Sequence, residues 1–279
     1  TSYSLINPVN LQNLSTKELQ KAACCNLSEV FETNSSVDVV FSDAISGMKK
    51  IHMLGLDGSY IQITSENMPL FRGIQKSFGL SHIPGSWIES IQIIKGTGSV
   101  VNGFESFTGQ INLEYFKPSN ADKIFWNFYS NSDGKLENNL LFSKKNGNWK
   151  SNLFTHISFF DREIDCNSNN TFGTVGDGYL DIPKIKHFSI LNRWAYTGSD
   201  IYRFQINVRG MLEERLSGQK KNVINPYVAD IDNGLINIYS KIGTVNSEGK
   251  SIALQSSLLI HKQNAQFGSN FYNVLQESS

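Results

Sequence analysis

The stretch at 87–116 carries the pattern that most directly suggests chemistry. Gly96 and Gly98 follow a strand-like run, and Glu114 lies near the end of the next one. A strand followed by a glycine-rich turn opens the loops that hold nucleotide phosphates, and an acidic residue about 20 positions later contacts the ribose. The third glycine of that motif is missing, however, and Gly103 would interrupt the helix whose N-terminal amides must face the phosphates. The pattern therefore argues against a nucleotide site.

The adjacent residues Cys24 and Cys25 suggest metal chemistry. Two thiolates, with His52 and the methionine thioethers of the N-terminal part, would suit a soft ion such as Cu(I) or Zn(II). Adjacent cysteines rarely bridge each other, because the geometry is strained. On a short helix, one of the two would instead face the core as a small hydrophobic side chain. Two alternatives therefore stay open, no cofactor at all or a Cu or Zn ion held by these cysteines.

No catalytic constellation is visible in the sequence. It contains no GxSxG, HExxH or P-loop motif, and its histidines lack the spacing of metal ligands; they are His52, His82, His156, His187 and His261. The formal net charge is zero, and no run of Lys or Arg forms a basic patch. We therefore expect no enzyme, and no nucleic-acid partner.

The composition suits a β-rich chain. Its 279 residues are 39% apolar and 11% aromatic, with 22 glycines. Nowhere do 18 apolar residues follow one another, as a transmembrane helix would require, but a membrane strand needs only about ten residues of alternation. Composition therefore leaves open a membrane protein built from strands and a soluble β protein.

Short elements follow one another up to Pro118. Ser15 and Glu18 have the spacing of a helix-capping box, and the apolar positions predict a helix beginning there and a second one at 27–31. Strand-like runs separated by glycine-containing turns follow at 37–41, 50–54, 60–64, 87–95 and 111–116. Several short strands with small helices predict an α+β unit.

After Pro118 the strand-like runs lengthen and alternate. In 201–212 the apolar side chains hold even positions, whereas polar ones, including Arg203 and Arg209, hold odd positions. Seven such strands are predicted, at about 121–130, 136–145, 148–160, 187–197, 200–212, 234–245 and 250–262. Their connections alternate between tight turns and longer loops, at 161–186 and 213–233, as in outer-membrane barrels. Only the first connection on the long side, around 132–134, is short.

The stretch from Lys95 to Leu113 resembles the end of the plug domain of TonB-dependent outer-membrane receptors. The family pattern is roughly RGPxSxLYGxxAxGGVINI, and the residues in register with it are Lys95, Gly96, Gly98, Ser99, Gly103, Gly109, Ile111, Asn112 and Leu113. The departures are Thr97, Asn102, Thr108 and Gln110. The order of helices and strands over about 17–117 resembles the plug as well. The run at 21–34, taken with 103–112, looks like a subgroup found in Bacteroidota.

The resemblance implies a fold in two parts. Residues 1–117 would form the α+β plug domain, and 118–279 the N-terminal portion of an incomplete antiparallel transmembrane β-barrel, with about seven strands present. The family barrel has about twenty-two strands, and an open sheet edge is not tolerated in lipid. We therefore expect a fragment of a longer protein in the outer membrane of a diderm bacterium, in contact with outer-membrane lipid.

The resemblance also implies a function, the active import of a scarce ligand. Energy would come from the inner-membrane proton gradient through the TonB–ExbB–ExbD complex. The ligand class stays open between a metal complex, siderophore, vitamin or glycan. The expected ligand contacts at the plug apex are Met68, Pro69, Leu70, Phe71 and Arg72. The expected contacts between plug and barrel are Glu105, Arg203 and Arg209.

A soluble or surface-exposed β-sandwich is the alternative. It would be a ligand-binding module behind an α+β N-terminal domain. Such a sandwich shows the same alternation of apolar and polar residues, but its apolar face lies in the core. Alternation alone therefore does not decide between the two folds, whereas the exposure of the apolar face would.

Overall fold

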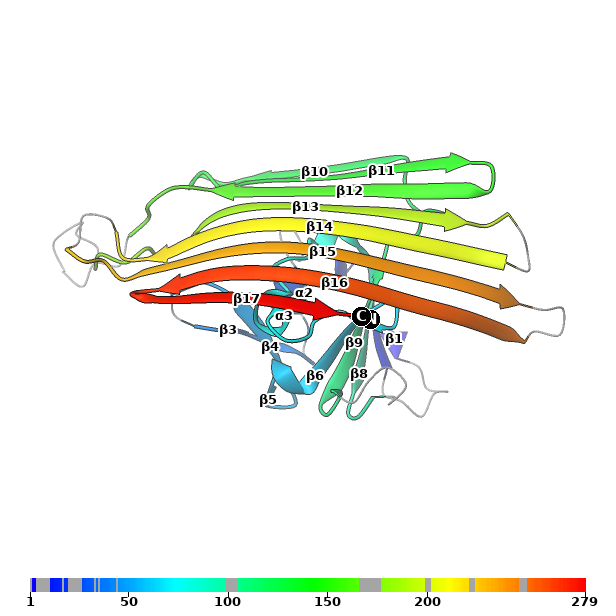
Figure 1. Ribbon diagram of the computed structural model, residues 1–279, viewed down its shortest axis with the longest axis horizontal. Coiled ribbons are helices and arrows are strands. Elements are labelled where there is room, and N and C mark those ends of the chain that lie inside the picture. Colours follow the sequence, from blue (N-terminus) through cyan, green and yellow to red (C-terminus); the bar gives the residue numbers. More distant parts are fainter. Residues whose placement is uncertain are drawn as a thin grey trace. The chain divides into compact units, whose positions relative to one another are not determined.

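The computed structural model describes residues 2–3, 11–16, 18–19, 27–32, 34, 36–43, 45–98, 105–165, 177–198, 202–220, 224–245 and 250–279. The chain divides into two compact units. The first unit comprises Thr1–Ser42 and Met48–Asn120, and the second comprises Asp43–Gly47 and Ala121–Ser279. Figure 1 follows the elements along the chain from blue to red.

A six-stranded sheet forms the centre of the first unit. Its strands, in spatial order, are β1 (Ser2–Tyr3), β2 (Leu11–Ser15), β8 (Ile88–Lys95), β9 (Gly109–Tyr115), β6 (Ile61–Ser65) and β7 (Met68–Pro69). Neighbours run antiparallel, except that β6 and β9 are parallel. Because Ile91, Ile93 and Ile111 are fully buried, the predicted strands at 87–95 and 111–116 supply much of the core.

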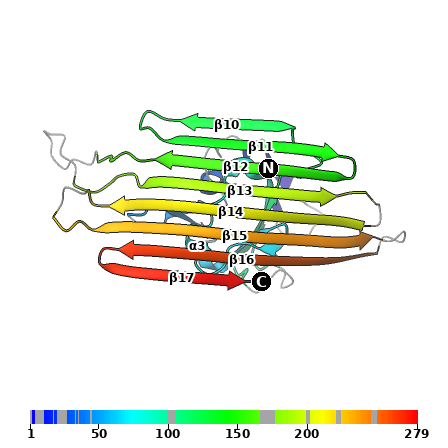
Figure 2. The ribbon, with the colours of Figure 1, turned by 45° about the horizontal axis from the view of Figure 1, so that its top comes forward.

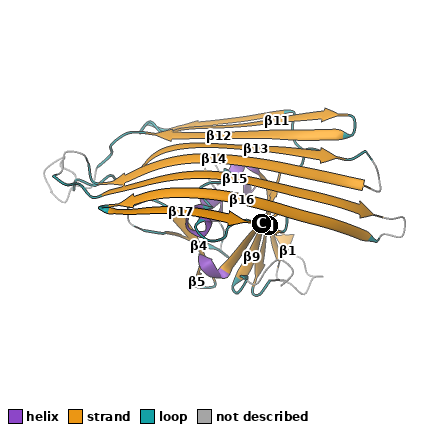
Figure 3. Ribbon diagram, in the orientation of Figure 1, coloured by secondary structure: helices purple, strands orange, loops and turns teal. Residues whose placement is uncertain are grey.

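Small elements complete the first unit (Figure 3). They are β3 (Asp38–Phe41), β4 (Lys49–Met53) and β5 (Leu56–Asp57) in one sheet, the helices α2 (Leu27–Glu32) and α3 (Gln75–Phe78), and the 3-10 turns η1 (Gly58–Tyr60) and η2 (Gly85–Trp87). The capping box is confirmed, since the Ser15 amide donates to Glu18 Oε2 at 3.0 Å. The α+β prediction is therefore right, although β1, β2, β5, β7 and α3 were not foreseen.

The glycines around the β8–β9 connection occupy positions where the backbone conformation or close packing disfavours a side chain. Gly96 adopts φ +91°, a backbone conformation that L side chains rarely take. A Cβ on Gly109 would lie 2.7 Å from the Ile94 carbonyl oxygen, and one on Gly98 would lie 2.6 Å from Ser106 Oγ. Ser99 and Gly103 of the same motif lie outside the described residues. A nucleotide-binding loop would lead into a helix, but the described part of this connection contains none.

Asn112 of the same motif joins three strands through its side-chain amide. Its Oδ1 accepts hydrogen bonds from Thr64 Oγ1 and from the Asn67 amide, both at 2.9 Å. Its Nδ2 donates to Glu114 Oε1 at 3.0 Å and to Gln92 Oε1 at 3.3 Å. Both atoms of this buried amide are thus satisfied, and the turn that leads into β7 is held against β9.

We expect Asn112→Leu to destabilise the first unit by about 2–4 kcal/mol, because the Asn67 amide and the Thr64 hydroxyl lose a buried acceptor. Thermal unfolding of the purified protein measures the loss, and faster amide exchange at Asn67 would localise it. Gln92→Met is the matched control, since it removes one long hydrogen bond and should cost at most about 1 kcal/mol. Unchanged stability of Asn112→Leu would contradict this role.

The second unit is one antiparallel sheet of eight strands in sequence order (Figure 2). The strands are β10 (Ile124–Ser130), β11 (Leu136–Asn146), β12 (Trp149–Phe160), β13 (Lys184–Tyr196), β14 (Tyr202–Gly218), β15 (Val228–Val245), β16 (Ser251–Phe267) and β17 (Asn270–Ser278). All seven predicted strands are present. The eighth, β17, was missed because its NFYNVLQES sequence alternates only weakly.

The structure corrects two of the predicted connections. The loop predicted at 213–233 is mostly strand, because β14 continues to Gly218 and β15 begins at Val228. At the same end of the sheet, β16 and β17 are joined by a tight turn in which Gly268 has φ +59°. The long connection after β12 is confirmed between Phe160 and Lys184. The alternation of tight turns with longer loops therefore holds for only part of the sheet.

The two faces of the eight-stranded sheet have opposite chemistry. Exposed apolar side chains line one face, among them Trp126, Phe128, Leu140, Phe142, Ile157, Phe188, Leu212, Ile236, Ile238, Leu254, Leu258 and Ile260. Buried polar side chains line the other, among them Glu137, Asn139, Asn152, His156, His187, Arg193, Asn207, Arg209, Glu213, Asn233 and His261. The apolar face is exposed and the polar face buried, which is the reverse of a soluble sandwich.

None of the helices described here has the length and apolar character needed to cross a membrane.

We expect Leu258→Arg to impair folding into a membrane. Leu258 is 46% exposed on the apolar face, and an arginine facing lipid near the bilayer midplane costs about 2–4 kcal/mol. The neighbouring Ser257→Arg, on the other face of β16, is the matched control and should fold normally. The measurement is the heat-sensitive electrophoretic mobility of protein folded in lipid vesicles. Equal effects of the two variants would argue against lipid on this face.

Candidate ligand-binding site

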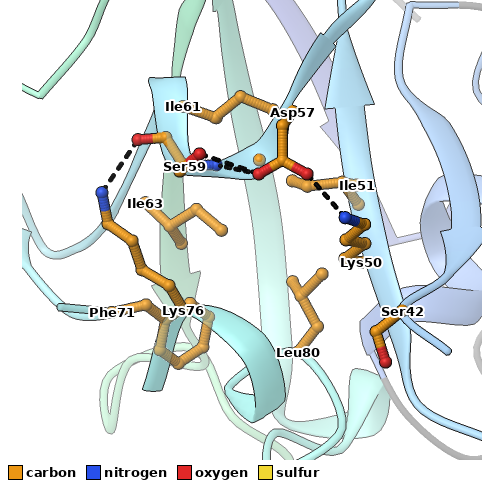
Figure 4. A pocket seen from close by; sticks show the side chains of 11 residues that line it. Ser42, Lys50, Ile51, Asp57, Ser59, Ile61, Ile63, Phe71, Lys76 and Leu80 are labelled. Carbon is orange, nitrogen blue, oxygen red and sulfur yellow. Dashed lines mark hydrogen bonds and ion pairs between the residues drawn. The ribbon is translucent and has the colours of Figure 1, made fainter. Parts of the chain in front are cut away.

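A pocket of about 220 Å³ opens within the first unit (Figure 4). Its walls come from β4, η1, β6, α3 and the segments beside them. The lining residues are Ser42, Lys50, Ile51, Asp57, Gly58, Ser59, Ile61, Ile63, Phe71, Lys76 and Leu80. The pocket therefore combines two ammonium groups and one carboxylate with an apolar floor.

Asp57 organises the polar side of the pocket. As the N-cap of η1, its Oδ1 accepts hydrogen bonds from Ser59 N at 2.9 Å and Ser59 Oγ at 2.8 Å. Its Oδ2 accepts from Lys50 Nζ at 2.7 Å, and His52 Nε2 lies 3.5 Å away. The bond from Lys50, followed by those from Ser59, holds the pKa of the Asp57 carboxyl well below its ordinary value. Asp57 is therefore ionised throughout the physiological range.

Lys76 reaches the pocket from α3 and completes its rim. Its Nζ donates to the Ser59 carbonyl oxygen at 2.9 Å, so the same turn binds a lysine on each side. The Nζ also lies 3.9 Å from Glu105 Oε2. Two cations thus face a pocket in which Asp57 is the acidic lining residue.

The apolar floor is made of side chains that are themselves part of the core. Ile51, Ile61 and Leu80 are almost fully buried, and Phe71 is 4% exposed. Phe71 packs against Gly79, where a Cβ would collide with the phenyl ring. The floor is thus held by core packing, while charged side chains form the rim.

The predicted apex residues occupy different surroundings. Met68 and Pro69 form the half-buried β7, and Leu70 is also half-buried. Of the predicted set, Phe71 lines the pocket. Arg72 Nε instead lies 3.6 Å from Glu105 Oε1. The ligand contacts of this set stay a prediction.

Sequence reasoning missed the charged rim of the pocket. Lys50 and Lys76 are 26 positions apart in the printed sequence and belong to different elements, so no spacing connects them. The Asp57–Gly58 turn between two strands was the one local signal, and it marked a turn without indicating its partners.

The remaining predicted site residues are placed as follows. Lys95 is half-buried at the end of β8. Glu105, predicted to contact the barrel, has its nearest cations, Arg72 and Lys76, within the first unit. Arg203 is exposed and Arg209 buried, both at odd positions of β14. Contacts of these residues between plug and barrel stay a prediction.

The predicted metal ligands Cys24 and Cys25 lie outside the described residues. Within the described ranges, no group of three or more His, Cys, Asp or Glu side chains could hold a metal ion. A Cu or Zn ion at the two cysteines therefore stays a prediction.

The connection after β12 and the connection after β14 contact each other in the second unit. Asp165, after β12, accepts hydrogen bonds from the amides of Asp177 and Gly178, and its Oδ2 lies 2.9 Å from Lys220 Nζ, beyond β14. These contacts, led by the bond from Lys220, lower the pKa of the Asp165 carboxyl. A bridge between Tyr179 and Gln219 adds backbone pairing. An ion pair and a backbone bridge therefore hold the two connections together.

Residues 6–110 match the family model of the TonB-dependent Receptor Plug Domain. The chain carries the plug domain of a TonB-dependent receptor. The first unit, with its sheet, small helices and pocket, is this plug domain. No curated protein sequence matches the chain.

Solved receptor structures share the fold of the plug domain and of the sheet that follows it. The alcaligin outer-membrane receptor FauA from Bordetella pertussis matches with a TM-score of 0.73 at 11% identity, over 98% of this chain and 42% of its own. The ferric-catecholate import receptor Fiu from E. coli K12 gives 0.71 at 13%, over 97% and 44%. The copper transporter OprC gives 0.62 at 12%, over 99% and 47%.

These matches establish a fold of plug domain plus unclosed antiparallel β-sheet. It is the fold of outer-membrane receptors, and the chain spans less than half the length of each matched structure.

We expect Asp57→Asn to lower the melting temperature of the plug domain by about 2 °C at neutral pH. A carboxyl whose pKa is lowered on folding stabilises the protein above its ordinary pKa of 3.8, and this contribution is lost as pH falls through the lowered value. The difference in melting temperature between the parent and Asp57→Asn should thus be constant above about pH 5 and shrink below about pH 4. Scanning fluorimetry across pH measures it.

Asp38→Asn, at an exposed carboxylate of β3, is the control for this experiment. A difference in melting temperature between the parent and Asp57→Asn that persists undiminished to pH 2 would contradict a lowered pKa of Asp57.

Proposed function

We propose that the protein is a TonB-dependent receptor that imports a scarce ligand across the outer membrane. The supporting observation is one chain that joins a plug domain to a sheet with an exposed apolar face and a buried polar face. Energy comes from the inner-membrane proton gradient through the TonB–ExbB–ExbD complex, as the plug family implies. The ligand is carried unchanged, so the protein is not an enzyme.

The plug pocket provides the chemistry that supports a ligand class. The solved relatives are named for alcaligin, ferric catecholates and copper, so the shared fold alone does not select a ligand. The lining contains Lys50, Lys76 and one ionised carboxylate, Asp57, so it keeps a net positive charge above an apolar floor that contains Phe71. Such a pocket favours a ligand with an anionic group and an apolar or aromatic part, as in many metal complexes and siderophores, over a neutral glycan.

The soluble sandwich is the weaker alternative. A sandwich covers the apolar face of one sheet with a second sheet, and its polar faces meet water. In the described part of the second unit, the single large sheet instead exposes its apolar side chains. Fractionation of cells producing the protein tests the point directly, because recovery in the soluble fraction would contradict the receptor function.

Uptake measurements test import itself. Cells with and without the protein are supplied with a labelled ferric siderophore, cobalamin, copper or an oligosaccharide. We expect accumulation of one ligand in producing cells, abolished by a protonophore that collapses the proton gradient. Accumulation that survives the protonophore would contradict TonB-dependent import. If cells with and without the protein accumulated each of these ligands to the same level, transport would be contradicted.

We expect Lys76→Ala to weaken binding of the imported ligand about tenfold, because one of two cations at the pocket is removed. Titration of the purified protein with that ligand gives the affinity. Lys49→Ala is the matched control, since Lys49 lies in the adjacent strand and pairs with Glu32 outside the pocket. Equal affinities of the two variants would exclude the pocket as the binding site.

A further inference from the structure

A short loop, Asp43–Gly47, belongs to the second unit although its neighbours in the chain belong to the first. In the sequence it lies between β3 and β4, which pair with each other. The Ser42 amide donates to the Met48 carbonyl oxygen at 2.7 Å, and Ser42 Oγ donates to the same oxygen at 3.1 Å. The two ends of the loop are thus held together by the first unit, while the loop itself is part of the second.

Asp43 gives the loop a turn of its own. Its Oδ1 accepts hydrogen bonds from the amides of Ile45, at 2.8 Å, and Ser46, at 2.5 Å, and its Oδ2 accepts one from the Ser46 hydroxyl. An aspartate that bonds the amides following it stabilises a turn locally. Gly47 ends the loop with φ +63°, a conformation that favours glycine. These local bonds therefore favour one conformation of the loop.

The sheet holds this loop at two points. Arg215 Nη1 of β14 donates to the Ser46 carbonyl oxygen at 3.1 Å, and these residues are only 4% and 1% exposed. Gly47 packs against Pro183, just before β13, so closely that a Cβ on it would lie 2.8 Å from Pro183 Cγ. A buried hydrogen bond and tight packing thus both fix the loop to neighbouring strands.

The sheet also fixes the position of Arg215. Arg215 Nε donates to Glu213 Oε1 at 3.2 Å, and Glu213 Oε2 lies 3.0 Å from His187 Nδ1. His187 Nε2 in turn lies 2.6 Å from Ser189 Oγ. All four side chains lie on the buried polar face, at alternate positions of β13 and β14. Moving the guanidinium away would leave a buried carboxylate without its cation, which is costly.

We propose that Asp43–Gly47 is an anchor, which stays bound to the eight-stranded sheet while the rest of the plug domain loosens. Strands in hydrocarbon have no water to replace their hydrogen bonds, so the sheet outlasts the water-soluble core. Ser42, Lys50 and Ile51, which flank the loop in the chain, line the plug pocket. That wall of the pocket is therefore tethered, whereas the walls on α3 and β6 are free to move.

The role of the anchor in import rests on the proposed function, but the anchoring itself does not. Amide exchange of the natural full-length protein in lipid vesicles, followed through a urea series, tests the anchoring without a ligand. The amides of Ile45 and Ser46 report on the loop, and those of β8 and β9 report on the plug sheet. We expect the loop amides to stay protected at urea concentrations at which the amides of β8 and β9 exchange freely.

The double variant Glu213→Gln, Arg215→Met should remove this difference. It takes out both members of a buried ion pair, so no charge is left uncompensated, and the new amide can still bond His187. The loop amides should then exchange about tenfold faster or more, because a hydrogen bond from a charged donor is lost. Heat-sensitive electrophoretic mobility verifies that the sheet folds.

The double variant Lys186→Met, Glu214→Gln is the matched control. It removes an ion pair, with Lys186 Nζ 3.0 Å from Glu214 Oε2, from the same two strands. These side chains are exposed on the opposite face of the sheet, so the loop amides should exchange as in the parent.

A cross-link tests the role in import, in a protein whose native cysteines are all replaced by serine. Gly47→Cys with Pro183→Cys joins the loop to the sheet, since a Cβ at Gly47 reaches the Pro183 ring. Uptake of whichever ligand accumulates, among the labelled ferric siderophore, cobalamin, copper and oligosaccharide, should be equal with the disulfide oxidised or reduced. Ser240→Cys with Ser256→Cys controls for oxidation, because the parent hydroxyls lie 2.7 Å apart within the sheet.

Three results would overturn the proposal. Loop amides that exchange at the same urea concentrations as those of β8 and β9 in the parent would mean that the loop opens with the plug. Protection that is unchanged in the Glu213→Gln, Arg215→Met variant, or equally lost in its control, would mean that Arg215 does not hold the loop. Uptake lost only with the loop disulfide oxidised would mean that the loop must leave the sheet. A parent that accumulates none of the ligands would instead contradict the proposed function, and the exchange result would still decide the anchoring.

Discussion

The second unit depends on one constraint, the exposure of an apolar sheet face whose reverse side is polar and buried. In hydrocarbon, backbone amides and carbonyls find no water, so each strand must be paired along its length. The continuous ladder from β10 to β17 pairs each inner strand with a neighbour on both sides, whereas β10 and β17 each have one unpaired edge. Side-chain polarity then follows the two-residue period of each strand, as in β14, where buried Arg209 and exposed Leu212 lie on opposite faces.

The plug domain obeys ordinary rules of a water-soluble core. Its strands bury isoleucines such as Ile91 and Ile111. Asn112 is central because one buried amide serves the neighbouring strands β6 and β8 and the turn before β7. The glycines of the 95–113 motif allow neighbouring groups to approach the backbone more closely than a Cβ would permit. They therefore explain why the plug is recognisable, while the chemistry of its pocket comes from residues outside the motif.

Charge has a different role in each unit. In the plug, Asp57 fixes the η1 turn while Lys50 and Lys76 bind to opposite sides of it, which holds two cations beside an apolar floor. In the second unit, Asp165 links the connections after β12 and β14, and a buried arginine of β14 binds the loop between β3 and β4. Charged side chains thus shape a pocket in the plug domain, whereas in the second unit they fix loops.

Sequence patterns alone were enough to predict the strands with strong alternation, the capping box at Ser15, the helix at 27–31 and the family of the plug motif. These features follow from local preferences, the two-residue strand period and backbone conformations that require glycine. The folded structure was needed to show which face of the sheet is exposed, where β14 ends, that β17 exists, and that Lys50 and Lys76 both bind the turn at 57–59. Such features depend on contacts between residues far apart in the chain, which local spacing does not encode.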